Sequence, residues 1–188
     1  MTRATGLRVA LLTGSYPPEP CGVGDYAHHL VQHLTDREGL TVEVWVGTSW
    51  PGGEDPRIRR VLAPSWWTTL RNISNAIRSF QPHLIHIQYP SLGYGRRLLP
   101  WILPLLLRLS AVRIVATWHE YFGEWLPRAL PSAWAASTVI AVRPGYRERL
   151  RSTTRLALGR RPIRMVPNAS TIPRVVHNER SRQELRQQ

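Results

Sequence analysis

Short apolar runs recur along the chain and predict seven β-strands. Each run is four to seven residues long, and most are followed directly by glycine or proline, which is typical of buried strands. The predicted strands are Leu7–Thr13, Thr41–Val46, Arg57–Ala63, Leu84–Tyr89, Arg113–Trp118, Thr138–Val142 and Ile163–Val166.

Helical periodicity fills most of the intervals between these runs. Within Trp67–Phe80, for example, Leu70, Ile73 and Ile77 recur at the spacing of an amphipathic helix. Four more helices are predicted at residues 26–34, 97–109, 125–136 and 146–158, and Asp25 is expected to cap the first of them. This alternation of strands and helices predicts an α/β sandwich with a mostly parallel sheet.

The charge of the chain is concentrated toward its C-terminus. The formal net charge is +13, and every one of the 25 basic residues is arginine. Twelve arginines and three glutamates lie after residue 142, so this part carries +9 and the first 142 residues carry only +4. Because the body is nearly balanced and no nucleic-acid motif is present, we expect no specific nucleic-acid partner.

The single cysteine and the lengths of the apolar runs exclude several classes of protein. Cys21 alone rules out an internal disulfide framework and a cysteine-rich zinc site, and no cluster of residues has metal-ligand spacing. Val9–Leu12 is too short for a signal peptide core, and Leu98–Leu107 is half of the ~20 residues needed to span a bilayer. We therefore expect a cytoplasmic protein that binds no metal.

The segment Arg96–Arg108 has two interpretations. Arginines flank an apolar stretch that contains Trp101, a pattern suited to peripheral contact with the inner membrane face. However, a helix this apolar normally packs against the sheet in an α/β fold. A core helix is the favoured interpretation, with membrane contact as the alternative.

Glycines gather in the loop after the first strand, at the edge where parallel sheets bind ligands. Gly22–Ala27 matches the dinucleotide pattern G-x-G-x-x-A, but Ser15–Cys21 separates it from the strand and no acidic residue ends the second strand. A nicotinamide or flavin site is therefore disfavoured. Two interpretations remain: a loop that presents backbone N–H groups to a ligand at a helix N-terminus, and a plain connection that needs positive φ.

Four short motifs resemble those of glycosyltransferase family 4. Ser15–Pro18 with Cys21–Tyr26 is similar to the Pro-Pro and glycine-rich loop that faces the acceptor in that family. Pro82–Gln88, Val115–Glu120 and Met165–Ala169 resemble, in the same order, its "P-D-hydrophobic-hydrophobic-H", "T-x-H-(D/E)" and "hydrophobic-P-N-G" segments. The resemblance covers about residues 7–188.

The resemblance implies a retaining glycosyltransferase of the hexosyltransferase type with the GT-B fold, in which two Rossmann-like domains face each other. Residues 1–172 would form the N-terminal, acceptor-side domain, a Rossmann-like three-layer sandwich, and residues 173–188 the connector toward a donor-binding domain. It also implies a nucleotide-sugar donor, a glycan or lipid-linked acceptor, no metal or other cofactor, and a role in polysaccharide or glycolipid biosynthesis. The chain alone is expected to be inactive without the second domain, supplied in cis or by a partner subunit.

Three residues depart from the family pattern, and one other function stays open. Cys21 replaces a glycine, Ala169 replaces the glycine after Asn168, and His83 stands where aspartate is common. These departures leave the sugar specificity undefined. The alternative function is a noncatalytic glycan-binding, lipid-binding or scaffold module that pairs with a separate catalytic subunit.

The resemblance points to His119 as the catalytic residue, beside the donor sugar and the reacting centre. A neutral imidazole there would hydrogen-bond a sugar hydroxyl or stabilise developing charge; a histidine satisfied by the neighbouring backbone is the alternative. The expected substrate contacts are Tyr16, Gly22, Val23, Gly24, Gln88, Tyr89, Glu120 and Asn168. Glu120 as a solvated acid and Asn168 as a simple turn residue remain alternatives. His86, inside an apolar strand, is expected to be a buried structural residue.

Overall fold

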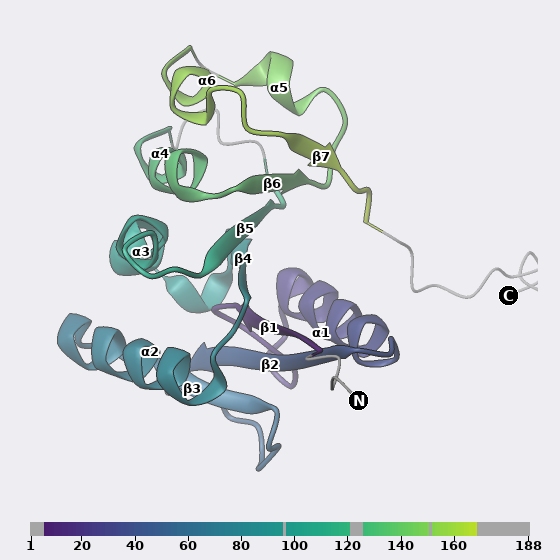
Figure 1. The fold of residues 1–188 in the computed structure, drawn as a ribbon, viewed down its shortest axis with the longest axis vertical. Coiled ribbons are helices and arrows are strands. Elements are labelled where there is room, and N and C mark those ends of the chain that lie inside the picture. Colours follow the sequence, from purple (N-terminus) through teal and green to yellow (C-terminus); the bar gives the residue numbers. More distant parts are fainter. Residues whose placement is uncertain (1–5, 96, 121–125, 151, 169–188) are drawn as a thin grey trace, which may run out of the picture.

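Seven parallel strands form the sheet around which the described part of the chain is built (Figure 1). The computed structural model describes residues 6–95, 97–120, 126–150 and 152–168. The strands are β1 (Leu7–Leu12), β2 (Leu40–Gly47), β3 (Ile58–Leu62), β4 (Leu84–Tyr89), β5 (Arg113–Trp118), β6 (Thr138–Ala141) and β7 (Ile163–Met165). They lie in the order β3-β2-β1-β4-β5-β6-β7, and each neighbouring pair is parallel. All seven predicted strands are confirmed.

Helices follow the strands and cover both faces of the sheet. They are α1 (Gly22–Thr35), α2 (Trp66–Phe80), the short 3₁₀-helix η1 (Leu92–Tyr94), α3 (Leu99–Leu107), α4 (Leu126–Ala135), α5 (Tyr146–Arg149) and α6 (Ser152–Leu158). α1 lies on one face of the sheet, whereas α2, α3 and α4 lie on the other (Figure 1). The predicted three-layer sandwich is therefore confirmed.

Alternation along the strands explains how both faces are buried. In β1, Val9 and Leu11 pack with Val31 of α1 in one apolar cluster. Ala10 and Leu12 point the opposite way and belong to the larger cluster beneath α2, α3 and α4. Successive side chains in a strand alternate between faces, so a strand covered on both sides presents apolar side chains to both.

The start of α1 differs from the prediction. The helix begins at Gly22 with Cys21 as its N-cap, so Asp25 lies inside the first turn and is not the cap. The backbone N–H of Asp25 donates the first helical hydrogen bond to the Cys21 carbonyl at 2.9 Å. Gly22 and Gly24 do not adopt positive φ, so the glycine-rich sequence joins the helix rather than forming a turn that requires glycine.

The last predicted helix, residues 146–158, is divided in two. α5 ends at Arg149, and Leu150 has extended backbone angles, φ −71° and ψ 136°, before α6 begins at Ser152. Leu150 is buried within the large apolar cluster. The break directs this side chain into the core, and its burial offsets the loss of helical hydrogen bonds.

α3 is the apolar helix for which membrane contact was the alternative interpretation. Trp101, Leu103 and Leu107 are buried in the large core cluster, which is the packing expected of a core helix. Arg108, the residue that follows α3, connects it to α4. Its guanidinium donates to the Trp134 carbonyl at 2.9 Å and lies 4.2 Å from the centre of the Trp134 ring. Among the described residues, no helix combines the length and the apolar character needed to cross a bilayer.

The loop after β1 and the loop after β4 are in direct backbone contact. The N–H of Gly93 donates to Ser15 Oγ at 2.8 Å. A Cβ atom added to Gly93 would lie 1.7 Å from the carbonyl oxygen of Gly14, and one added to Gly14 would lie 2.7 Å from the backbone nitrogen of Tyr94. Only glycine at these two positions allows the loops to meet at this edge of the sheet.

We therefore predict that Gly93→Ala lowers the free energy of unfolding by about 1–3 kcal/mol, because backbone atoms cannot yield as a side chain does. Gly53→Ala is the matched control, since a Cβ there meets no atom within 4 Å and the residue does not adopt positive φ. Urea denaturation followed by circular dichroism measures both variants. Equal stability of the two variants would contradict the assigned backbone contact.

Candidate active site

A pocket of about 680 Å³ opens at the carboxyl edge of the sheet. Its lining residues all follow strand ends or belong to the helices beside them: Cys21, Gly22, Val23, Pro90, Ser91, Leu92, Gly95, Trp101, His119, Glu120, Arg128, Arg143 and Asn168. The pocket adjoins the loops after β1 and β4, where the strand order reverses and the connecting helix changes face. This switch point is the usual ligand site of a doubly wound parallel sheet.

His119 is held at the wall of this pocket by the sheet itself. It is the first residue after β5, and its backbone N–H donates to the Tyr89 carbonyl at 2.7 Å. Its ring nitrogen Nε2 lies 2.8 Å from Oε1 of Gln88, on the adjacent strand β4. The imidazole and the ring of Tyr26 in α1 form a T-shaped pair with 4.8 Å between ring centres. Only 7% of the residue is exposed, so its orientation is tightly constrained.

The Gln88 contact defines which imidazole nitrogen is available to a ligand. An amide oxygen only accepts hydrogen bonds, so Nε2 of His119 carries the hydrogen and Nδ1 is left as an acceptor. Nδ1 has no hydrogen-bond partner among the described residues. Gln88 is fully buried, and its amide nitrogen likewise has no partner within the described part of the chain. Gln88 therefore acts behind His119, as a positioning residue.

Burial keeps His119 neutral. Removal from water lowers its pKa from the ordinary value of 6.5 to about 4. The imidazole is thus uncharged at neutral pH, as anticipated from the sequence, and suits accepting or donating a hydrogen bond rather than acting as a fixed cation.

His86 is the structural residue that the sequence indicates. It is buried within β4, and its Nε2 lies 2.7 Å from Oγ1 of Thr117 on β5. Burial, with a smaller effect of the nearby His119, lowers its pKa to about 4. His86 does not line the pocket.

The structure brings together five of the nine residues expected at the site. His119, Gly22, Val23, Glu120 and Asn168 line the pocket. Gln88 lies one layer behind, in contact with His119.

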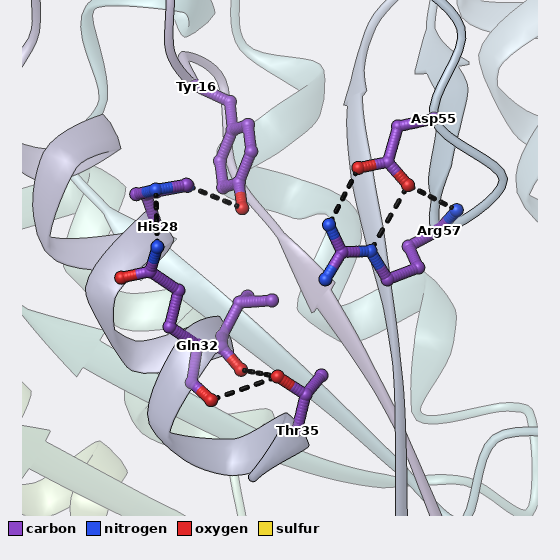
Figure 2. Close-up of polar contacts among 7 residues, drawn as sticks. Tyr16, His28, Gln32, Thr35, Asp55 and Arg57 are labelled. Carbon is purple, nitrogen blue, oxygen red and sulfur yellow. Dashed lines mark hydrogen bonds and ion pairs between the residues drawn. The ribbon is translucent and has the colours of Figure 1, made fainter.

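The remaining three expected contacts lie outside the pocket lining. Tyr16 is buried beside α1, with its hydroxyl oxygen 3.1 Å from His28 Nδ1, and His28 in turn contacts Gln32 (Figure 2). Gly24 packs against the backbone of the loop after β1, where an added Cβ would lie 3.1 Å from the Ser15 carbonyl oxygen. Tyr89 donates its hydroxyl to the Pro100 carbonyl at 2.6 Å.

Sequence reasoning missed three polar residues of the pocket, Ser91, Arg128 and Arg143. Ser91 and Arg143 belong to loops after strands, which is a usable signal. Arg128 lies on α4, and nothing in its sequence surroundings distinguishes it from the other arginines. No group of three or more His, Cys, Asp or Glu side chains suited to a metal ion occurs among the residues the structure describes.

The parallel sheet, its switch point and the pocket there define a Rossmann-like ligand-binding domain. The family model for glycosyltransferase family 4 matches residues 20–170, and the chain belongs to this family. The match and the seven-stranded sheet agree with the N-terminal half of a GT-B fold. Comparison with curated proteins gave no match.

The two buried histidines predict acid destabilisation. Between about pH 6.5 and pH 4 the unfolded chain protonates both imidazoles, whereas the folded chain does not, so the free energy of unfolding decreases as the pH falls. The full effect is on the order of 3 kcal/mol for each imidazole. Urea denaturation at several pH values across this window measures the slope.

His119→Gln should reduce this slope by about half, because one of the two imidazoles is removed. His33→Gln, at an exposed position of α1, controls for the substitution itself. A slope in His119→Gln as steep as in the unsubstituted chain would contradict the assignment.

The Gln88 contact predicts the tautomer of His119. In the unsubstituted chain, ¹⁵N spectra should show Nε2 as the protonated nitrogen and Nδ1 as the unprotonated one. Gln88→Leu removes the acceptor and should produce a mixture of both tautomers. Gln32→Leu, which removes a glutamine beside His28 instead, should leave the His119 signals unchanged. An unchanged tautomer in Gln88→Leu would show that another group orients the ring.

Proposed function

We propose that this chain is the acceptor-side domain of a retaining glycosyltransferase that moves a sugar from a nucleotide-sugar donor to a glycan or lipid-linked acceptor. The observation that carries the proposal is the neutral His119, fixed by the sheet and by Gln88 at the wall of the switch-point pocket. Family membership supports glycosyl transfer in general. The acceptor side is proposed because the pocket occupies the N-terminal half of the fold.

In this proposal His119 recognises a sugar hydroxyl. Its Nδ1 is an acceptor without a partner among the described residues, so a sugar hydroxyl can donate to it without displacing a hydrogen bond within the protein. The imidazole dipole is held in place before substrate arrives, and such preorganised groups stabilise developing charge without reorganising. Glu120, the next residue, is exposed and lines the same pocket, where its carboxylate is suited to a second hydroxyl.

Departure of the nucleoside diphosphate creates positive character on the donor sugar and negative charge on the leaving group. A neutral His119 does not repel the developing oxocarbenium ion, as an imidazolium would. Groups that hold the leaving diphosphate are proposed to belong to the second domain. The noncatalytic binding module remains the alternative outcome of the test.

The test is transfer by the protein expressed from the whole reading frame, assayed with a panel of nucleotide sugars by release of nucleoside diphosphate. His119→Ala should lower kcat by on the order of 100-fold, the usual cost of removing one preorganised group at a reacting centre. His33→Ala, at the exposed position used above, is the control and should retain full activity.

Product analysis by NMR should show that the anomeric configuration of the donor is kept. Near-normal turnover in His119→Ala would remove this residue from the site. Absence of transfer with every donor, together with binding of glycans, would favour the noncatalytic module.

A further inference from the structure

Tyr26 is the residue of α1 whose aromatic ring lies against His119. The two rings form a T-shaped pair with 4.8 Å between their centres and 77° between their planes, a favourable arrangement for aromatic groups. Tyr26 belongs to neither of the two apolar core clusters, although Ala27, the next residue, belongs to one of them. Packing of the core therefore does not explain an aromatic residue at this position.

The hydroxyl group of Tyr26 does not explain its presence either. It has no hydrogen-bond partner among the described residues. The side chain is half-buried, and burial raises the pKa of the phenol above its ordinary value, so the ring carries no charge at neutral pH. What the residue contributes is the apolar surface of its ring, and that surface is in contact with His119.

The first turn of α1 is seated closely enough on the loop after β1 to bring Tyr26 to the end of β5. A Cβ atom added to Gly24 would lie 3.1 Å from the Ser15 carbonyl oxygen and 3.3 Å from the Cα atom of Tyr16. The helix thus approaches the loop with its backbone, and Tyr26 follows Gly24 within the same stretch of helix. Its place beside His119 is set by this backbone contact.

Tyr26 and Gln88 constrain the imidazole in different ways. Gln88 accepts a hydrogen bond from Nε2 of His119 at 2.8 Å and so selects the tautomer. Tyr26 contacts the ring itself and contributes to its burial, which leaves His119 only 7% exposed and lowers its pKa to about 4. Neither contact uses Nδ1 as a hydrogen-bonding atom, so this nitrogen stays available to a ligand.

We propose that Tyr26 is a positioning residue whose ring holds the imidazole of His119 in place at the pocket and shields it from water. Its contribution to transfer rests on the proposed function, in which a neutral imidazole meets the substrate. The contact with His119 does not depend on that function. Without the ring, the imidazole is expected to be hydrated and less constrained, so it is less preorganised and gains a proton more readily.

The first experiment follows the His119 signals of the 188-residue chain by NMR from about pH 4 to about pH 8. Tyr26→Leu removes the aromatic ring and should raise the proton affinity of His119 at least about tenfold, because burial is the cause of its lowered pKa. Tyr26→Phe keeps the ring and should leave this affinity unchanged. An unchanged affinity in Tyr26→Leu would overturn the proposal. A change in Tyr26→Phe as large as in Tyr26→Leu would also overturn it, since the hydroxyl would then be responsible.

Tyr26→Leu is expected to fold, because leucine favours helices and Tyr26 lies outside both core clusters. Circular dichroism checks this, and Tyr26→Met, another good helix former, repeats the test if the leucine variant is poorly folded.

Leu34→Ala separates this effect from a general weakening of α1. Leu34 packs against the apolar cluster that contains Val31 of the same helix. Its truncation should lower the free energy of unfolding and leave the pKa of His119 at about 4. A rise in the proton affinity of His119 as large as that in Tyr26→Leu would assign the effect to helix stability and overturn the proposal.

Charged and titratable groups near His119 are the same in all of these variants. They lie on β4 and around the pocket, and they are His86, Glu120, Arg128 and Arg143. A pKa of His119 that changes only when the Tyr26 ring is lost therefore reports the ring.

The second experiment measures transfer by the protein expressed from the whole reading frame between about pH 5 and about pH 8. At neutral pH, Tyr26→Leu should lower kcat by about tenfold, less than loss of the imidazole itself, and leave the donor KM unchanged. Its kcat should decrease further toward pH 5 as His119 gains a proton, whereas Tyr26→Phe should match the unsubstituted enzyme. Parallel pH profiles of Tyr26→Leu and the unsubstituted enzyme would overturn the role in transfer.

The two experiments distinguish failure of this inference from failure of the proposed function. Transfer by the unsubstituted enzyme together with an unchanged proton affinity in Tyr26→Leu would overturn the inference and leave the proposed function intact. Absence of transfer with every donor, together with the expected NMR result, would contradict the proposed function and leave the shielding of His119 by Tyr26.

Discussion

Hydrogen bonding between β4 and β5 is the constraint on which the site depends. Toward their carboxyl ends, the side chains that these strands turn toward α1 are polar: His86 pairs with Thr117, and Gln88 with His119. Their sequence neighbours point to the opposite face and join the apolar core. Buried polar groups are costly without partners, so a shift of β4 against β5 would break both pairs together. The two pairs therefore fix the register of these strands. The imidazole at the pocket is the last member of this series.

The fold was predictable because most of the strands are buried and leave a strong apolar signal. β4 and β5 have the bounds expected from their residues, since each run is followed directly by a proline or by a polar residue. The beginning of α1 was misjudged because Gly22 and Gly24 have low helix propensity, yet here they are helical and lie against a pocket and a neighbouring loop. Tertiary contacts also break the last helix at Leu150.

The site was only partly predictable. Residues directly after strands, such as His119, can be placed by the rule that ligands bind at the carboxyl ends of parallel strands. Tyr16 has the same kind of position but turns beneath α1 to contact His28, which depends on packing that a sequence does not display (Figure 2). Arg128 reaches the pocket from a helix, and only the assembled fold distinguishes it from the other arginines.

The attachment of His119 to the sheet rather than to a loop has an evolutionary consequence. Its ring is fixed by Gln88 and its backbone by Tyr89, and both belong to a central strand. The loops after β4 and β6 provide Ser91 and Arg143, which line the same pocket. Loop residues tolerate replacement far better than strand residues do. A lineage of such proteins is therefore free to change the lining of this pocket by exchanging loops, while the imidazole held by the central strand keeps its position.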